Sequence, residues 1–183
     1  KDVSYEINSH SFRGDEFNSI KPENTFRIFL IGGSTIQGWG VEKEETISYL
    51  MQNNLNSLGY TKHFEVINAG MGGAWSKDEV DLVKNKIFDL EPDIIIIYDG
   101  WNDSLKQSGF HLGFDSKATP ESWKNRWEEI CSISNQYDTQ IIITIQPILG
   151  SDMNRVLTDH ENALLTSEGS SGHNQVISNL KKH

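Results

Sequence analysis

Four short runs of apolar, largely β-branched residues recur along the chain. They are Arg27–Ile31, Phe64–Asn68, Asp93–Tyr98 and Gln140–Gln146. Two of these runs are apolar almost throughout, which is typical of parallel strands that are covered on both faces. We therefore predict four strands at these positions.

Helical periodicity fills the intervals between the runs. Apolar residues recur at spacings of three and four within Thr46–Leu58, Lys77–Leu90 and Pro120–Tyr137, and Pro120 opens its segment as a proline at the first helical position does. Strands that alternate with helices predict βαβ units. The expected fold class is α/β, with a three-layer, doubly wound (flavodoxin-like) parallel sheet.

The length of 183 residues fits one domain with a continuous core. Residues 1–24 are polar and irregular, so we expect an N-terminal extension there and the α/β domain over residues 25–183. Few apolar residues follow position 150, and residues 167–172 form a Ser/Gly patch. No internal repeat is present in the sequence.

Charge and composition exclude several classes of function. The net charge of -10 and the isoelectric point near 5.0 oppose a phosphate backbone, so nucleic acid is not an expected partner. No apolar run approaches the roughly 18 residues that a membrane span requires. Cys131 is the only cysteine, which excludes an intrachain disulfide and a thiolate metal cluster.

Candidate chemistry lies directly after three of the predicted strands. The first strand leads into Gly32–Thr35, the second into Asn68–Gly73 and the third into Gly100–Asp103. Ligands of an open parallel sheet bind beyond the carboxyl ends of its strands, so these segments should meet. They offer a hydroxyl, backbone N–H groups at glycines and a carboxamide, which are the groups that acyl transfer requires.

In order and in position, these three segments resemble the first three conserved blocks of the SGNH (GDSL-like) hydrolases. The resemblance covers roughly residues 12 to 150. It implies that Ser34 is the nucleophile, and that Gly73 (through its N–H) and Asn102 (through its side-chain amide) bind the oxyanion. The N–H of Ser34 would be the third donor. The implied substrate is a lipid or acetylated-carbohydrate ester, with no cofactor and no metal.

The fourth block of that family, an Asp-x-x-His, is absent from the sequence. None of the six histidines has an aspartate three positions before it. We expect these partners in a C-terminal part of the protein outside the residues given, so the present chain should be nearly inactive alone. Phe12-Arg13-Gly14 resembles a lead-in of some microbial members, which suggests export or anchoring through a segment not shown.

Other interpretations of the same residues stay open at this point. Ser34 or Thr35 would cap the next helix if the Gly-Gly-Ser-Thr turn is purely structural. Asn102 either begins a glycosylation sequon or serves as a turn residue. Asp103 is expected to hold its loop by hydrogen bonds, and Gln146 either binds substrate or satisfies backbone groups.

Competing catalytic motifs fail on particular residues. A Gly-x-Ser-x-Gly elbow requires glycine where Ile36 stands, and no His-Glu-x-x-His is present. The sequence therefore favours a metal-independent serine esterase. The alternatives are a catalytically silent SGNH-like module that binds a carbohydrate or a protein, and a flavodoxin-like domain whose glycine loops hold a phosphate.

Overall fold

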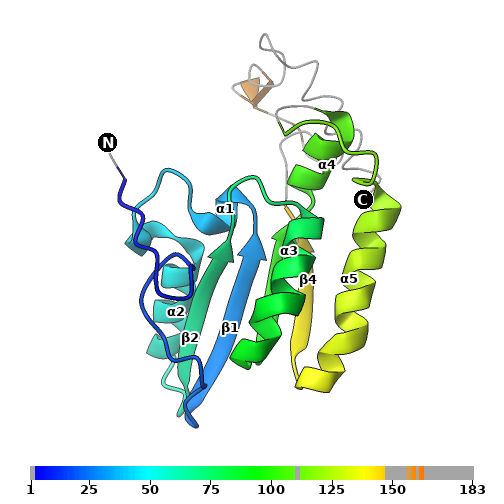
Figure 1. Cartoon of the computed structure of the whole chain (residues 1–183). Coiled ribbons are helices and arrows are strands. Elements are labelled where there is room, and N and C mark those ends of the chain that lie inside the picture. The colour runs from blue at the N-terminus through cyan, green and yellow to red at the C-terminus, as the bar shows by residue number, and fades with distance from the viewer. Residues whose placement is uncertain (1–2, 110–111, 147–155, 157, 160, 163–183) are drawn as a thin grey trace.

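A computed structural model describes residues 3–109, 112–146, 156, 158–159 and 161–162 of the chain. Its centre is a four-stranded, all-parallel sheet with the strand order β2-β1-β3-β4 (Figure 1). The strands are β1 (Thr25–Gly32), β2 (His63–Gly70), β3 (Ile94–Asp99) and β4 (Gln140–Ile145). All four predicted strands and the doubly wound, flavodoxin-like order are thereby confirmed.

The three predicted helices are also present. They are α2 (Ile47–Ser57), α3 (Ser76–Leu82) and α5 (Pro120–Ser134). The predicted segment at Lys77–Leu90 is continuous but not uniform, because a π-helical turn at Val83–Ile87 and a 3₁₀ turn at Phe88–Leu90 extend α3. A second 3₁₀ turn, Asn135–Tyr137, completes the segment that begins with α5.

Two short helices at the carboxyl ends of the strands were not predicted. They are α1 (Ser34–Gln37) and α4 (Trp101–Ser108), which follow β1 and β3 directly. Both ends of α4 are glycines in the left-handed conformation, Gly100 with φ 108° and Gly109 with φ 74°. Glycine accepts this conformation without strain, so these two residues define where the helix starts and stops.

The sheet separates two apolar layers, which gives the predicted three-layer architecture. Successive residues of a strand point to opposite faces. Phe29 and Ile31 of β1 therefore pack with α3 and α5, whereas Ile28 and Leu30 pack on the α2 side. Figure 1 shows α2 on one side of the sheet and α3 with α5 on the other.

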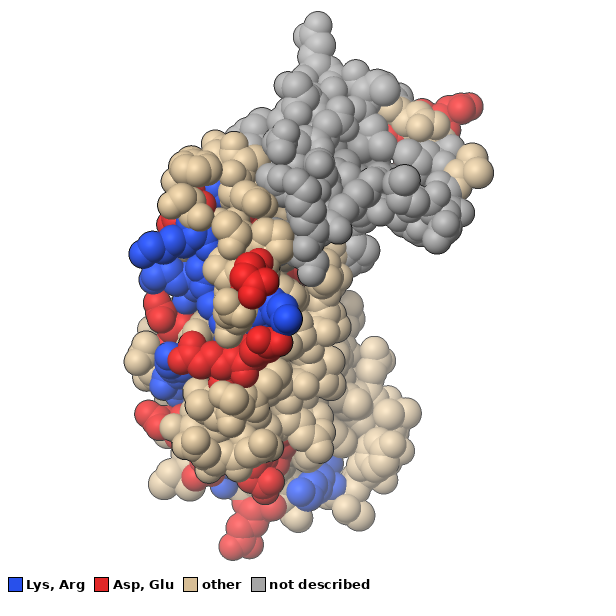
Figure 2. Space-filling model, turned by 90° about the vertical axis from the view of Figure 1, so that its right-hand side faces the viewer, with Lys and Arg blue, Asp and Glu red and all other residues tan. Residues whose placement is uncertain are grey.

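The outer strand β4 departs from the expectation of cover on both faces. Ile142, Ile143 and Ile145 are 44%, 36% and 46% exposed, and β4 is the last strand of the described sheet on its side, with a neighbouring strand on one edge only. Figure 2 shows charged side chains mainly on the left and at the bottom of its view, and few among the described residues on the right.

The N-terminal segment is irregular, as its composition predicts, but part of it is packed against the sheet. Phe12 is buried in the core and meets Phe29 edge to face, with 5.7 Å between the ring centroids. Arg13 forms an isolated antiparallel bridge with Asn68 of β2. No helix among the described residues is both long enough and apolar enough to cross a membrane.

Candidate active site

Ser34 lies at the point where the strand order of the sheet reverses. β1 has β2 on one side and β3 on the other, so the carboxyl ends of β1 and β3 flank the crevice in which ligands of such sheets bind. Ser34 is the half-buried first residue of α1. The N-cap of α1 is Gly33, and no side chain caps this helix, so the capping interpretation of Ser34 and Thr35 is wrong.

The Asn102 side chain lies against the backbone that precedes Ser34. Asn102 stands in the first turn of α4 and is 8% exposed. A Cβ atom added to Gly33 would overlap the Nδ2 atom of Asn102, so only glycine leaves room for the amide at this position. The structure therefore brings the first and third sequence segments into contact.

The second segment joins the same cluster through backbone groups. The Met71 N–H donates to the Gly32 carbonyl at 2.9 Å, and the Asn102 Nδ2 group donates to the Ala74 carbonyl. Between them, Gly73 has φ 77°, which is a left-handed conformation that glycine adopts without strain. All three predicted segments, with Ser34, Gly73 and Asn102, thus meet at one edge of the sheet.

Hydrogen bonding fixes how the Asn102 amide is oriented. A carboxamide nitrogen carries two N–H donors, and one of them is used on the Ala74 carbonyl. The second N–H has no hydrogen-bond partner among the described residues. Because the Asn102 side chain is buried and bonded, the sequon interpretation is disfavoured.

Asp103 holds the neighbouring loop by hydrogen bonds, as the sequence predicted. Its side chain is fully buried, and its carboxylate accepts from the Ser76 N–H at 2.9 Å and from the Ser76 hydroxyl at 2.5 Å. Arg126 of α5 donates to the same hydroxyl at 2.9 Å and lies 3.5 Å from the carboxylate. The guanidinium also covers the Trp75 ring at 4.6 Å, so buried Trp75 is a packing residue.

Sequence reasoning missed a buried acidic pair behind this loop. Asp99 ends β3 and accepts from the Trp123 indole N–H at 2.9 Å, while Glu79 is fully buried on α3. Burial, and then the charge of Asp103, raise the pKa of Asp99 to about 8. Burial, followed by the charges of Asp99 and Asp103, also holds the pKa of Glu79 well above its ordinary value.

A signal for this pair was present in the pattern of the sequence. Glu79 precedes Val80 on the helix face that carries the buried residues of α3, and Asp99 interrupts an otherwise apolar strand end. Acidic residues at positions that the periodicity assigns to the interior indicate protonated or paired carboxyls. The raised pKa values of Asp99 and Glu79 favour the uncharged form of both carboxyls.

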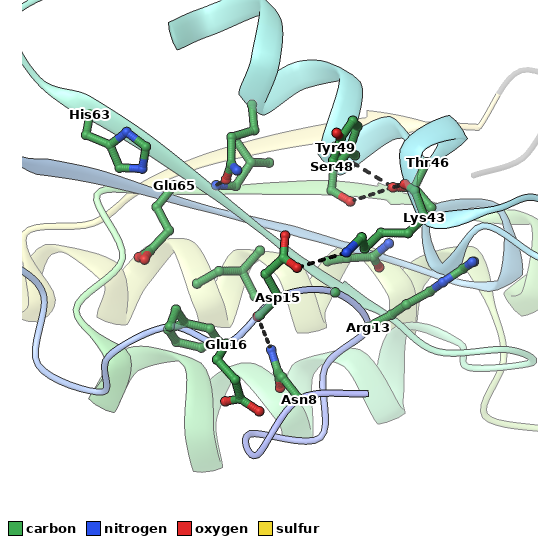
Figure 3. A pocket seen from close by; sticks show the side chains of 16 residues that line it. Asn8, Arg13, Asp15, Glu16, Lys43, Thr46, Ser48, Tyr49, His63 and Glu65 are labelled. Atoms are coloured by element: carbon green, nitrogen blue, oxygen red, sulfur yellow. Dashed lines mark hydrogen bonds and ion pairs between the residues drawn. The ribbon is translucent and has the colours of Figure 1, made fainter. Parts of the chain in front are cut away.

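Two hollows are present near these elements. An open groove of about 440 Å³ includes Ser34 in its lining. A second hollow of about 150 Å³ lies between the N-terminal segment, α2 and β2, and Figure 3 shows Asp15 directed toward Lys43 within it. Their ion pair measures 2.9 Å, and none of the three predicted site residues lines this second hollow.

Comparison with known proteins identifies the fold. No protein-family model matches the chain, and no curated protein matches it. An acetyl xylan esterase, AlAXEase, matches with a TM-score of 0.58 at 18% identity over 86% of this chain and 71% of its own. A protein from Desulfitobacterium hafniense, named as a lipolytic protein of the G-D-S-L family, matches with a TM-score of 0.54 at 16% identity over 68% of this chain.

The chain has the SGNH-hydrolase fold. A variant of the esterase AlinE4 is similar as well, with a TM-score of 0.54 at 21% identity over 69% of this chain. The chain spans 63% of the AlinE4 variant and 62% of the D. hafniense protein.

A general base is not supplied by the histidines that the structure describes. His10 stacks on Phe17 at 4.3 Å, and its Nε2 atom lies 3.2 Å from the Phe17 carbonyl. His63 begins β2, at the opposite edge of the sheet from Ser34. The remaining histidines lie outside the described residues. Gln146 donates to the Thr35 hydroxyl at 2.9 Å, so this side chain reaches the crevice as predicted.

Among the described residues, no group of three or more His, Cys, Asp and Glu side chains lies where it could hold a metal ion. The acidic residues closest to the candidate site, Asp99 and Asp103, are committed to Trp123 and to Ser76 with Arg126. The described site therefore offers hydrogen-bond donors and a hydroxyl, not a ligand set.

Proposed function

We propose that this protein is an ester hydrolase, with Ser34 as nucleophile. The observation that carries the proposal is the Asn102 amide, which lies against Gly33 and is bonded to the Ala74 carbonyl. A hydroxyl and a fixed amide donor on neighbouring residues are what acyl transfer needs.

The proposed reaction has two halves. The Ser34 Oγ attacks the ester carbonyl carbon and loses its proton to a general base, and the carbonyl oxygen becomes an oxyanion. The N–H groups of Ser34 and Gly73 and the free N–H of Asn102 stabilise that charge. The alcohol leaves with a proton from the base, and water then hydrolyses the acyl-enzyme, which restores the Ser34 hydroxyl.

The general base has to come from outside the described residues. The SGNH resemblance points to the histidine of an Asp-x-x-His segment for this role, oriented by its aspartate. Several similar structures are named as esterases, and AlAXEase is named as an acetyl xylan esterase. These names support an ester substrate, and among the expected lipid and acetylated-carbohydrate esters they favour a small acyl group.

The experiment measures hydrolysis of 4-nitrophenyl acetate by the complete protein and by two variants. We expect Ser34→Ala to abolish turnover and Thr35→Ala, which removes the adjacent exposed hydroxyl, to retain most of it. EDTA should leave the rate unchanged. Turnover that survives Ser34→Ala, or that EDTA removes, refutes the proposal. A folded parent protein without any turnover supports the silent binding module instead.

A further inference from the structure

The groove beside Ser34 has an aromatic wall. Its lining residues come from α1, from the loop that follows it and from the start of α2. They are Ser34, Thr35, Gly38, Trp39, Val41, Glu45, Thr46 and Ile47. The groove is open and has a volume of about 440 Å³, which is enough for one or two sugar rings.

Trp39 is the largest group in this lining and is 75% exposed. Its backbone N–H donates to the Ser34 carbonyl at 2.9 Å, so the position of Trp39 is coupled to that of the nucleophile. An exposed indole offers a ligand a large, flat apolar surface, and covering that surface is favourable.

The loop that carries Trp39 is held rigidly from below. The Arg13 guanidinium donates to the carbonyls of Gln37 at 2.8 Å, Gly38 at 2.5 Å and Val41 at 2.6 Å. These three bonds come from a side chain that is 4% exposed, so water does not compete for them.

Tyr5 fastens the same loop from the outside. Its hydroxyl accepts from the Gly40 N–H at 2.9 Å, the Arg13 guanidinium lies 4.2 Å from its ring, and its ring centroid is 6.4 Å from that of Trp39. An aromatic surface on a preorganised loop binds a ligand without first losing conformational entropy.

The charge around the groove selects against anions. Glu45 lines the groove, and Glu42 and Glu44 lie close to it in the sequence, with Lys43 between them. The Lys43 ammonium pairs with Glu6 and Asp15, at 2.9 Å each, and this neutralises the one cation of the run. Anionic polysaccharides and anionic lipid surfaces are therefore repelled from this side.

We propose that Trp39 binds a sugar ring of a neutral carbohydrate whose ester group lies at Ser34. The placement of the ester at Ser34 rests on the proposed function. The axial C–H groups of a sugar ring form a flat, weakly positive surface that stacks on the negative face of an indole. A long acyl chain fits less well, because an open groove leaves most of its surface in water.

Isothermal titration calorimetry of the 183-residue chain tests the proposal, with xylohexaose, cellohexaose and sodium octanoate as probes. We expect at least one oligosaccharide to bind with a dissociation constant of about 1 mM or below. Trp39→Ala should weaken this binding roughly tenfold or more, and Trp39→Phe should lose less. The matched control is Tyr60→Ala, which removes a 65% exposed aromatic from the other end of the strands and should change nothing.

Three outcomes overturn the inference. They are the absence of oligosaccharide binding up to about 10 mM, equal affinity after Trp39→Ala, and Trp39-dependent binding of octanoate alone, which would assign the groove to acyl chains. Thermal melts of each variant confirm that the fold is retained. Because stacking does not need the Ser34 hydroxyl, Ser34→Ala should still bind the sugar, so loss of esterase activity and loss of sugar binding are separable results.

Discussion

Asn102 has a structural hydrogen bond, and we propose a chemical role for it as well. One N–H of its amide is bonded to the Ala74 carbonyl, and the other has no hydrogen-bond partner among the described residues. The first bond limits rotation of the side chain, so the second donor is aimed before the substrate arrives. Preorganised donors of this kind act mainly on the charge that develops in the transition state, because the neutral ground-state carbonyl gains little from them.

This arrangement predicts the kinetic effect of Asn102→Ala in the complete, active protein. Loss of one oxyanion donor should lower kcat by about a hundredfold or more and leave KM nearly unchanged. Loss of the bond to the Ala74 carbonyl should also lower the free energy of unfolding by about 1 kcal/mol. Steady-state kinetics with 4-nitrophenyl acetate and urea titration measure the two effects separately.

Ser104→Ala provides the matched control for Asn102. Ser104 is buried in the same helix, and its hydroxyl donates to the Gly100 carbonyl at 3.1 Å. This substitution should also reduce stability by about 1 kcal/mol but leave kcat intact. If both alanine variants lose the same fraction of kcat, Asn102 braces its helix and does not bind the oxyanion.

At the scale of elements, one buried carboxylate joins three helices. Asp103 of α4 accepts two hydrogen bonds from Ser76, the first residue of α3, and Arg126 of α5 lies beside both. The bonds connect α4, which carries Asn102, to the loop that ends at α3 and contains Gly73. These bonds therefore hold the two segments that carry the proposed oxyanion donors at a fixed spacing.

We expect Asp103→Asn to weaken the contact between α4 and α3 and to lower the free energy of unfolding. The Ser76 N–H and hydroxyl both donate to the carboxylate, whereas an asparagine side chain has one acceptor oxygen and would face a donor with its NH₂ group. The loss should amount to about 1–3 kcal/mol of unfolding free energy. Chemical denaturation measures it.

Arg126→Gln tests whether the ion pair or the hydrogen bonds dominate. Arg126 lies 3.5 Å from the Asp103 carboxylate, but its side chain is partly exposed. Partial exposure screens the interaction, so this variant should lose less than Asp103→Asn. If Arg126→Gln loses more unfolding free energy than Asp103→Asn, the ion pair with Arg126 stabilises this contact more than the hydrogen bonds to Ser76 do.

At the scale of the whole molecule, the buried acids link stability to pH. Asp99 has a pKa of about 8, and burial raises the pKa of Glu79 in the same direction. The folded protein therefore binds these protons more tightly than the unfolded chain does. Their stabilising contribution is complete in acid below about pH 4 and is lost as pH rises toward about 8.

We therefore predict that these groups make the free energy of unfolding fall as pH rises from about 5 to 8. The contribution is up to about 1.4 kcal/mol per pH unit for each proton. Glu79→Gln and Asp99→Asn should each flatten that slope. Glu121→Gln, at an exposed position of α5, is the control and should not change it. Urea titrations at several pH values measure the slopes, and unchanged slopes in both buried variants would contradict protonated carboxyls.

The sequence by itself determined the strands, the main helices and the place of the candidate site. Hydrophobic periodicity depends on near neighbours in the chain, so it was visible without tertiary information. The topology of a parallel sheet then predicted that the segments after β1, β2 and β3 meet at one edge, and this prediction brought Ser34, Gly73 and Asn102 together. Their catalytic roles remain a proposal.

Tertiary structure alone decided which polar groups are buried and what they contact. The octapeptide of α4 has glycines at both ends, and its Asp103 side chain accepts from Ser76, which lies 27 positions earlier in the chain. Arg13 is far in sequence from the carbonyls that it binds, and the pKa of Glu79 is raised by its burial and then by the charges of Asp99 and Asp103, which lie far from it in the chain. Such contacts join residues that are distant along the chain. A local pattern of apolar and polar residues does not specify which distant residue a buried polar group will contact.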